Sequence, residues 1–363
     1  MTAALTPRER VSLALRELYQ TYGYRQYRMS KFEEYDLYAR NRSFLTDDHI
    51  LTFSDLNGKL MALKPDVTLS VIKNTRPERG TRKLWYTENV YRVPRNADSF
   101  QEIVQTGLEC IGHVDVYTMG EVLMLSARSL ETVGTDYVLC LSHMGILTGV
   151  LESGLVPEEL TGAILAAAGE KNLHTLRALC EKAGASPETA ELLERLCTLD
   201  GPAGETLPKL LSLPLPAESR AAAEELSAIC GLLPVFGDYP VRLDLSVIDD
   251  TDYYNGLLFR GFVDGAARPV LSGGRYDHLL HRMGHAGSAI GFAVYLSELE
   301  RLLTENRAFD ADTVLVYSPE DDPAAVAAAA RAAAERGSVR VQLRGEGGVL
   351  GRRRIGPDGR EEA

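Results

Sequence analysis

Long apolar runs are missing from this sequence of 363 residues. No stretch approaches the ~18 consecutive apolar residues that a membrane-spanning helix requires. The segment from Met1 to Arg10 also lacks the apolar core of a signal peptide. These two absences predict a cytoplasmic protein with no membrane partner.

Paired cysteines are missing as well. The chain has five cysteines and no Cys-x-x-Cys motif, and its histidines show none of the spacings of a zinc site. His278 and His281 lie three residues apart, and we expect them to face solvent. The pattern predicts reduced, mostly buried thiols, with no metal site and no cofactor in this chain.

An excess of positive charge is also missing, because 39 Lys and Arg stand against 51 Asp and Glu, for a formal net charge of -12. A protein that binds a nucleic acid usually presents a concentrated basic face. The cluster Arg352-Arg353-Arg354 is a local exception, which we interpret as a solvated tail. The charge balance therefore argues against tRNA as a partner.

The sequence does contain enough apolar material, 45% of its residues, for a large core and more than one domain. Apolar spacing predicts a helix from Pro7 to Tyr22, and Asn57-Gly58 between two apolar segments predicts a β-hairpin. Hairpins with few crossover helices favour antiparallel pairing. We expect a helix from Phe292 to Thr304, and further strands over residues 83–92, 100–111, 137–142, 241–248, 256–263 and 270–272.

Leu- and Ala-rich helical sequence interrupts these strands between His143 and Leu233. We interpret residues 143–233 as a helical insertion, and residues 1–142 and 234–305 as the two halves of one core. The last segment, residues 311–363, carries a strand, an Ala-rich helix and a second strand. That order predicts a small βαβ-like unit.

Five short motifs, each weak alone, occur in the order and approximate spacing of the histidyl-tRNA synthetase catalytic core. They are Lys64-Pro65-Asp66-Val67-Thr68, the stretch from Leu84 to Arg92, Gln105-Thr106-Gly107-Leu108-Glu109, Asp252-Tyr253-Tyr254-Asn255-Gly256 and Gly273-Gly274-Arg275-Tyr276-Asp277. The chain therefore resembles a class II aminoacyl-tRNA synthetase core over residues 10–302. Within that family it most resembles the synthetase-like regulatory subunits of short-form ATP phosphoribosyltransferase, which serve the first step of histidine biosynthesis. The resemblance implies an α+β fold with an antiparallel sheet flanked by helices, a helical insertion and a truncated C-terminal α/β unit.

Departures from the synthetase pattern remove cations from the presumed nucleotide site. Asp249 stands where a synthetase has an arginine that stabilises the reacting carboxylate and phosphate, and Glu298 stands where an arginine clamps the triphosphate. The loop after Arg92 is shorter and lacks a second ATP-binding arginine, and Ser30 takes the place of the motif 1 proline. A carboxylate repels a triphosphate, so the resemblance implies a degenerate ATP site, no catalytic residues and no autonomous catalysis.

Polar residues of the substrate pocket are retained. By resemblance, Asp66 lies near the amino group of a bound histidine, and Tyr253 approaches the imidazole. By the same resemblance, Gln105 and Glu109 lie in the pocket floor. A carboxylate suits an ammonium group, and a tyrosine can flank a ring and hydrogen-bond to it. The histidine-binding candidates that the resemblance implies are Asp66, Thr68, Arg92, Gln105, Glu109, Tyr253, Tyr254, Arg275 and Tyr276.

Each candidate also has a structural interpretation. Tyr253 and Tyr254 fit positions in a strand, and Asp66 fits a turn or a cap after a proline. Arg92 and Arg275 fit structural ion pairs. The functional interpretation therefore depends on the ordered set of motifs.

The resemblance implies histidine as the ligand, a homodimer through the core, and a catalytic ATP phosphoribosyltransferase subunit as partner in a hetero-octamer. Histidine is the end product of the pathway, so a chain that binds it can shift its partner between active and inhibited arrangements. Two alternatives stay open: a histidyl-tRNA synthetase-like amino-acid-activating enzyme, and a stand-alone histidine sensor with another partner. About 50 residues follow Asp312, fewer than the ~90 to 100 of a complete anticodon-binding domain.

Overall fold

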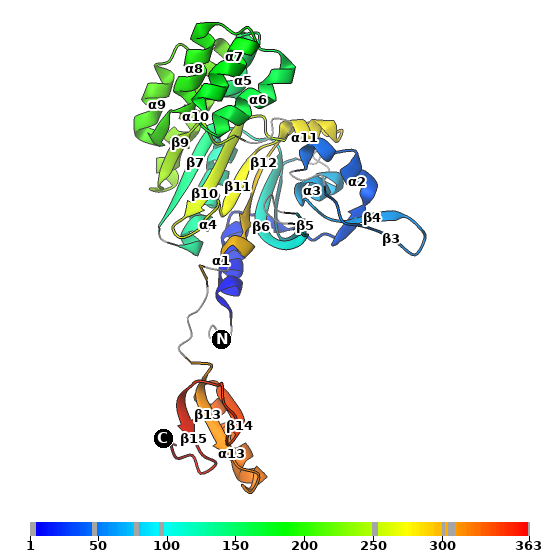
Figure 1. Ribbon diagram of the computed structural model, residues 1–363, viewed down its shortest axis with the longest axis vertical. Helices are drawn as coiled ribbons and strands as arrows, with labels where there is room; N and C mark the ends of the chain where they lie inside the picture. The colour runs from blue at the N-terminus through cyan, green and yellow to red at the C-terminus, as the bar shows by residue number, and fades with distance from the viewer. Residues whose placement is uncertain are drawn as a thin grey trace. The chain divides into compact units, whose positions relative to one another are not determined.

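The computed structural model describes residues 5–45, 49–75, 80–93, 98–134, 136–248, 253–299, 302–303 and 309–361. The chain divides into two compact units, residues 1–303 and 304–363 (Figure 1). No helix among the described residues is both long and apolar enough to cross a membrane. Four of the five cysteines, Cys110, Cys140, Cys180 and Cys197, are buried, as predicted.

A nine-stranded sheet forms the centre of the first unit, in the order β1-β5-β6-β12-β11-β10-β7-β9-β8. Neighbours from β5 through β7 pair antiparallel, whereas the β1–β5 and β7–β9 pairs are parallel. The predicted antiparallel sheet is thus confirmed over its central strands. The bounds are β1 Arg25–Gln26, β5 Arg82–Arg92, β6 Gln101–Gly112, β7 Tyr137–His143, β8 Asp200–Pro202, β9 Val241–Asp244, β10 Leu257–Val263, β11 Leu271–Arg275 and β12 Ser288–Tyr295.

The two faces of this sheet carry separate cores. Leu108 and Cys110 of β6 belong to the larger core, which includes residues of α1 (Pro7–Thr21) and α4 (Val116–Val133). Alternation along the strand turns Glu109 to the opposite face. A smaller core on that side contains residues of α2 (Tyr35–Ala39), α3 (Thr68–Asn74), the 3₁₀ turn η2 (Arg42–Phe44) and α11 (Asp277–Arg282). The candidate site lies on this second face.

A small second sheet, in the order β2-β4-β3, extends from the first unit (Figure 1). Its strands are β2 Phe32–Glu34, β3 Thr52–Ser54 and β4 Leu60–Leu63. The predicted hairpin joins β3 to β4, and Gly58 has a φ of +77°, a left-handed conformation that glycine adopts without steric cost.

Six helices lie between β7 and β9, at one end of the large sheet (Figure 1). They begin at Met144 and end at Phe236, and their buried leucines, such as Leu176, Leu193 and Leu226, join the larger core. The helices therefore continue the core of the sheet. Their bounds are α5 Met144–Ser153, α6 Glu158–Gly169, α7 Leu173–Lys182, α8 Pro187–Cys197, α9 Ala203–Leu211 and α10 Ala217–Phe236.

Two predicted elements differ from the structure. The helix expected from Phe292 is wrong at its start, because residues to Tyr295 continue strand β12, and in the described part of this segment the helix, α12, covers Leu296–Leu299. Ile290, Phe292 and Val294 of this strand belong to the larger core and Ala289 belongs to the smaller one, so both faces are largely buried and the sequence is apolar without clear alternation. The strand expected over 241–248 ends early, where the Asp244 side chain accepts a hydrogen bond from the Ser246 amide at 3.0 Å and begins a turn.

The C-terminal unit is a three-stranded parallel sheet in the order β14-β13-β15. β13 (Ala311–Tyr317), α13 (Pro323–Ala334) and β14 (Val339–Leu343) form a βαβ unit. The third strand, β15 (Gly351–Ile355), contains the arginine cluster that we interpreted as a solvated tail. That interpretation is wrong for Arg353, which is half-buried and donates from Nε to Thr313 Oγ1 at 2.7 Å.

Candidate functional site

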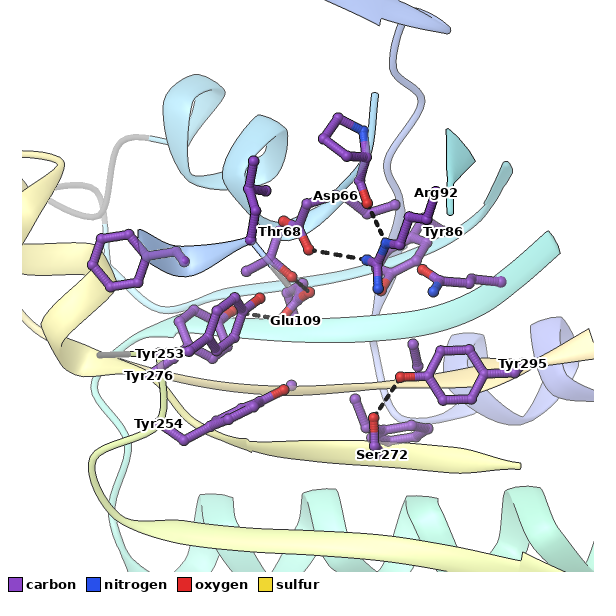
Figure 2. A pocket seen from close by; sticks show the side chains of 18 residues that line it. Asp66, Thr68, Tyr86, Arg92, Glu109, Tyr253, Tyr254, Ser272, Tyr276 and Tyr295 are labelled. Atoms are coloured by element: carbon purple, nitrogen blue, oxygen red, sulfur yellow. Dashed lines mark hydrogen bonds and ion pairs between the residues drawn. The ribbon is translucent and has the colours of Figure 1, made fainter. Parts of the chain in front are cut away.

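A cavity of about 110 Å³ lies on the face of the large sheet opposite α4, beside the smaller core (Figure 2). A space of this size admits a small molecule or several waters. Its walls come from β5, β6, β11, β12, the segment before α3 and the segment before β10. It brings together all but one of the predicted histidine-binding residues, namely Asp66, Thr68, Arg92, Gln105, Glu109, Tyr253, Tyr254 and Tyr276.

Three glycines make room for the side chains of this pocket. Gly291 pairs with Glu109 across β12 and β6, and a Cβ at Gly291 would overlap Oε2 of that carboxyl group. A Cβ at Gly107 would lie 2.7 Å from the Tyr86 hydroxyl, and one at Gly274 would lie 2.6 Å from the ring of Tyr254. Any larger residue at these positions would displace the groups that line the cavity.

Glu109 is held by two hydroxyl groups. Its side chain is 2% exposed, Thr68 Oγ1 donates to its Oε1 at 2.8 Å, and the Tyr276 hydroxyl donates to its Oε2 at 2.5 Å. Burial raises the pKa of Glu109 to about 8, although these two hydrogen bonds act in the opposite direction. This environment therefore favours a protonated Glu109 near neutral pH, and the two hydrogen bonds fix that carboxyl group in position.

The two carboxyl oxygens of Asp66 contact different partners, the backbone of α3 and the side chain of Arg92. Its Oδ1 accepts a hydrogen bond from the Leu69 amide at 2.8 Å in the first turn of α3, while its Oδ2 lies 3.4 Å from Nη2 of Arg92. Burial raises the pKa of Asp66, and the Arg92 guanidinium opposes that effect. Arg92 also donates from Nε to the Pro65 carbonyl. The helix-cap interpretation of Asp66 and the ion-pair interpretation of Arg92 therefore both hold, and both residues still line the cavity.

Aromatic rings form one wall. The ring centroids of Tyr253 and Tyr254 are 4.6 Å apart, and Tyr253 lies 6.2 Å from Tyr276 and 6.4 Å from Phe44. Such tilted arrangements suit a planar guest that contacts ring faces and edges.

The predicted set of histidine-binding residues omitted several lining residues, among them Phe44, Ser272, Tyr295 and also Tyr86, which lies within the Leu84 to Arg92 motif. Strand alternation could have identified some of these residues. Tyr86 pairs with Gly107, and Tyr295 pairs with Gln105, so both lie on the face of the predicted floor residues. Phe44 offered no such signal, because η2 reaches the pocket through tertiary packing.

Arg275 is the predicted candidate that does not line the cavity. It pairs with Ile290 on β12, one residue out of step with the floor, so alternation turns its side chain to the other face. There its Nε donates to Asp277 Oδ2 at 2.8 Å and its Nη1 lies 3.3 Å from Glu225 Oε1. These contacts agree with the alternative interpretation of Arg275, in which it forms structural ion pairs.

A second cavity of about 690 Å³ adjoins the first and shares four lining residues with it, Arg92, Gln105, Ser272 and Tyr295. The exposed side chain of Glu298, the acid of the presumed nucleotide site, lies in its wall. Arg260 and Arg268 also line it, and the motif comparison did not identify either residue. Arg260 donates from Nη2 to the Ile248 carbonyl at 2.8 Å. Asp249 and residues 94–97 lie outside the described residues.

The first cavity thus combines two carboxyl groups, a guanidinium, several hydroxyls and an aromatic wall. This combination suits a small zwitterion with a hydrogen-bonding ring. Among the residues that the structure describes, no group of three or more His, Cys, Asp or Glu side chains is placed to hold a metal ion.

Comparison with known proteins places these observations in a family. The family model of histidyl-tRNA synthetase matches residues 3–299. An ATP phosphoribosyltransferase regulatory subunit of Caldanaerobacter subterraneus subsp. tengcongensis is 31% identical over 77% of this chain and 74% of its own length.

Solved structures agree with that placement. A protein of Bacillus halodurans described as an ATP phosphoribosyltransferase regulatory subunit/histidyl-tRNA synthetase superposes with a TM-score of 0.78, at 24% identity, over 93% of this chain and 89% of its own. A chain of an ATP phosphoribosyl transferase complex of Thermotoga maritima superposes with a TM-score of 0.60, at 20% identity, over 78% of this chain and 96% of its own. These superpositions show the class II synthetase-like fold that the motifs predicted.

Proposed function

Since the chain belongs to the family of ATP phosphoribosyltransferase regulatory subunits, we propose that it binds histidine in the tyrosine-lined pocket and regulates a catalytic ATP phosphoribosyltransferase. The observation that carries this proposal is the convergence of Asp66, Glu109 and the three tyrosines Tyr253, Tyr254 and Tyr276 on one cavity of small-molecule size.

The pocket chemistry accounts for selection of histidine. The ammonium group of the amino acid lies near Asp66 and Gln105, its carboxylate lies toward Arg92, and its ring lies between the tyrosines and Glu109. A neutral imidazole has one donor and one acceptor, and a carboxyl group complements it whether or not that group carries a proton. A site with fixed hydrogen-bonding groups rejects analogues that leave those groups unpaired.

We propose that this subunit performs no catalysis of its own. Glu298 places a carboxylate in the cavity that adjoins the histidine pocket. By the motif resemblance, this position is one where a synthetase has an arginine that binds the triphosphate. Arg260 and Arg268 line the same cavity, so the proposal rests on the carboxylate of Glu298 and on the missing second arginine in the loop after Arg92. Histidine binding without activation is the consequence.

The alternative of an amino-acid-activating enzyme has a direct test. Purified chain with histidine, ATP and labelled pyrophosphate should give no exchange above a blank without protein. Exchange that depends on histidine would contradict the non-catalytic role and leave the fold and pocket unaffected.

The proposed partner is a catalytic ATP phosphoribosyltransferase chain, which would bind ATP and phosphoribosyl pyrophosphate. The family name and the fold shared with a chain of the Thermotoga maritima complex support this partner. A homodimer through the synthetase-like core and a hetero-octamer with the catalytic chain follow from the same resemblance.

Reconstitution tests the regulatory role. The candidate catalytic subunit is assayed for phosphoribosyl-ATP formation with and without this chain, across a histidine titration. We expect activity to require this chain and to fall as histidine rises. If the chain changes neither the activity nor the response to histidine, the regulatory role is wrong and the stand-alone sensor becomes the better account.

A further inference from the structure

Three neighbouring strands of the large sheet have termini at the same end of the sheet, next to the helical insertion. β7 ends at His143, β11 ends at Arg275, and β10, which runs antiparallel between them, begins at Leu257. Leu257 pairs with His143, and Leu258 pairs with Gly274, the residue before Arg275. The side chains of His143, Leu257 and Arg275 therefore share a face, and it is the face opposite the histidine pocket.

Glu225 of α10 bridges two of these residues, His143 and Arg275. Its Oε2 lies 2.8 Å from Nε2 of His143, and its Oε1 lies 3.3 Å from Nη1 of Arg275. His143 is 5% exposed, and its Nδ1 is buried without a hydrogen-bond partner. Because an unpaired buried N–H is costly, we assign the proton to Nε2, which donates to Glu225. The insertion thus reaches the back of the pocket through one carboxylate.

The backbone around Arg275 holds the pocket tyrosines. The Arg275 carbonyl accepts from the Asn255 amide at 3.1 Å, and the Asn255 side chain accepts from the Asp277 amide at 3.0 Å. Asn255 directly follows Tyr254, and Tyr276 lies between Arg275 and Asp277. Two walls of the pocket are therefore fixed to the same short turn.

The insertion contacts this turn at a second point. The Met144 amide, at the start of α5, donates to the Gly256 carbonyl at 2.9 Å. Gly256 itself lies against Arg275, since a Cβ at Gly256 would be 3.2 Å from Cδ of that arginine. The tyrosine segment is thus linked to the insertion at two points, through Gly256 to Met144 and through Arg275 to Glu225.

We propose that Glu225 is a positioning residue that couples occupancy of the tyrosine pocket to the order of α10 in the helical insertion. The coupling rests on the proposed function for the identity of the ligand, histidine. Ligand contacts with Tyr254 and Tyr276 hold the turn from Arg275 to Asp277, and Arg275 then holds Glu225. By reciprocity, loss of the Glu225 contact lowers the affinity of the pocket for histidine.

The test uses the full chain and two single substitutions. Glu225→Gln removes the charge of the bridge with little change in shape, and Glu224→Gln makes the same change at the adjacent, exposed position of α10. Histidine affinity is measured by isothermal titration calorimetry, and hydrogen exchange of α10 is measured with and without saturating histidine. If Glu225 has only a structural role, histidine should still change hydrogen exchange of α10 in the Glu225→Gln variant.

We expect Glu225→Gln to weaken histidine binding by about five- to tenfold, in the range of measured couplings between sites, and Glu224→Gln to stay within about twofold of the unmodified chain. Histidine should slow exchange in α10 in the unmodified chain and in Glu224→Gln but not in Glu225→Gln. Equal affinity and equal protection in all three proteins would overturn the coupling while leaving the proposed function in place.

If the proposed function is wrong, the result differs, because the unmodified chain then shows no histidine binding. That result would also overturn the proposed coupling. If Glu225→Gln does not fold, the unmodified chain alone decides the question. Bound histidine that leaves α10 exchange unchanged would overturn the proposal.

Discussion

Glu109→Gln should make the ligand-free protein more stable at alkaline pH while weakening histidine binding. The wild-type carboxyl group is 2% exposed, and burial raises its pKa from 4.5 to about 8. A buried anion is costly, and the amide carries no charge. Thr68 and Tyr276 can each accept as well as donate, so the amide keeps its hydrogen bonds.

The sign of the pH dependence follows from the direction of this shift. Between pH 4.5 and about 8 the unfolded chain has released the Glu109 proton while the folded chain retains it, so rising pH favours the unfolded state. The effect grows through that window and is constant above it. Each pKa unit corresponds to ~1.4 kcal/mol, which sets an upper limit of about 5 kcal/mol for the full shift. Burial of the amide has its own cost, so we expect a stabilisation of about 1 to 3 kcal/mol.

Chemical denaturation at about pH 5 and about pH 9 measures this difference in the free energy of unfolding. The single tryptophan, Trp85, is buried in the larger core and reports unfolding by its fluorescence. Glu102→Gln is the matched control, because Glu102 lies on the same strand but is exposed. The reasoning is refuted if Glu109→Gln is no more stable than the unmodified chain at the higher pH, or if its advantage is larger at the lower pH.

Further predictions concern the pocket and its support. Asp66→Asn keeps an oxygen for the cap of α3 but removes the charge beside Arg92, so calorimetry should show histidine binding weakened at least about tenfold. Gly291→Ala should lower the unfolding free energy by about 3 kcal/mol or more, since the added Cβ overlaps the buried Glu109 carboxyl group. Gly162→Ala, where the added Cβ meets open space on α6, should raise it by about 0.5 to 1 kcal/mol in the same denaturation assay. Lys64→Met leaves the Glu88 carboxylate without its fully buried ion-pair partner and should lower the unfolding free energy by about 3 kcal/mol or more. A loss below about 1 kcal/mol would contradict a structural role for this ion pair.

Local rules predicted much of the fold. Apolar spacing predicted α1, which begins at Pro7, and Asn57-Gly58 predicted the hairpin. Local rules were insufficient for β12. Both faces of this strand are largely buried, so its sequence lacks the alternation that distinguishes a strand from a helix. The arginine cluster was likewise misread, since its place in β15 depends on pairing with a strand about 40 residues earlier.

The pocket was predictable in composition but only partly in geometry. Ordered motifs identified Glu109 and the tyrosines because family resemblance transfers residue types at fixed spacing. Arg275 was grouped with them because its motif is contiguous, whereas strand alternation sends it to the opposite face. Its partner Glu225 comes from a distant helix, and no local pattern in the sequence links the two.

The most direct test of the central claim is histidine inhibition of a complex reconstituted from the catalytic subunit and either the unmodified chain or Asp66→Asn. Phosphoribosyl-ATP formation is normalised to the activity of each complex without histidine. We predict that histidine inhibits the unmodified complex and that the inhibition curve of the Asp66→Asn complex lies at histidine concentrations at least about tenfold higher. Superimposable curves would contradict the claim that the tyrosine pocket of this chain is the regulatory histidine site.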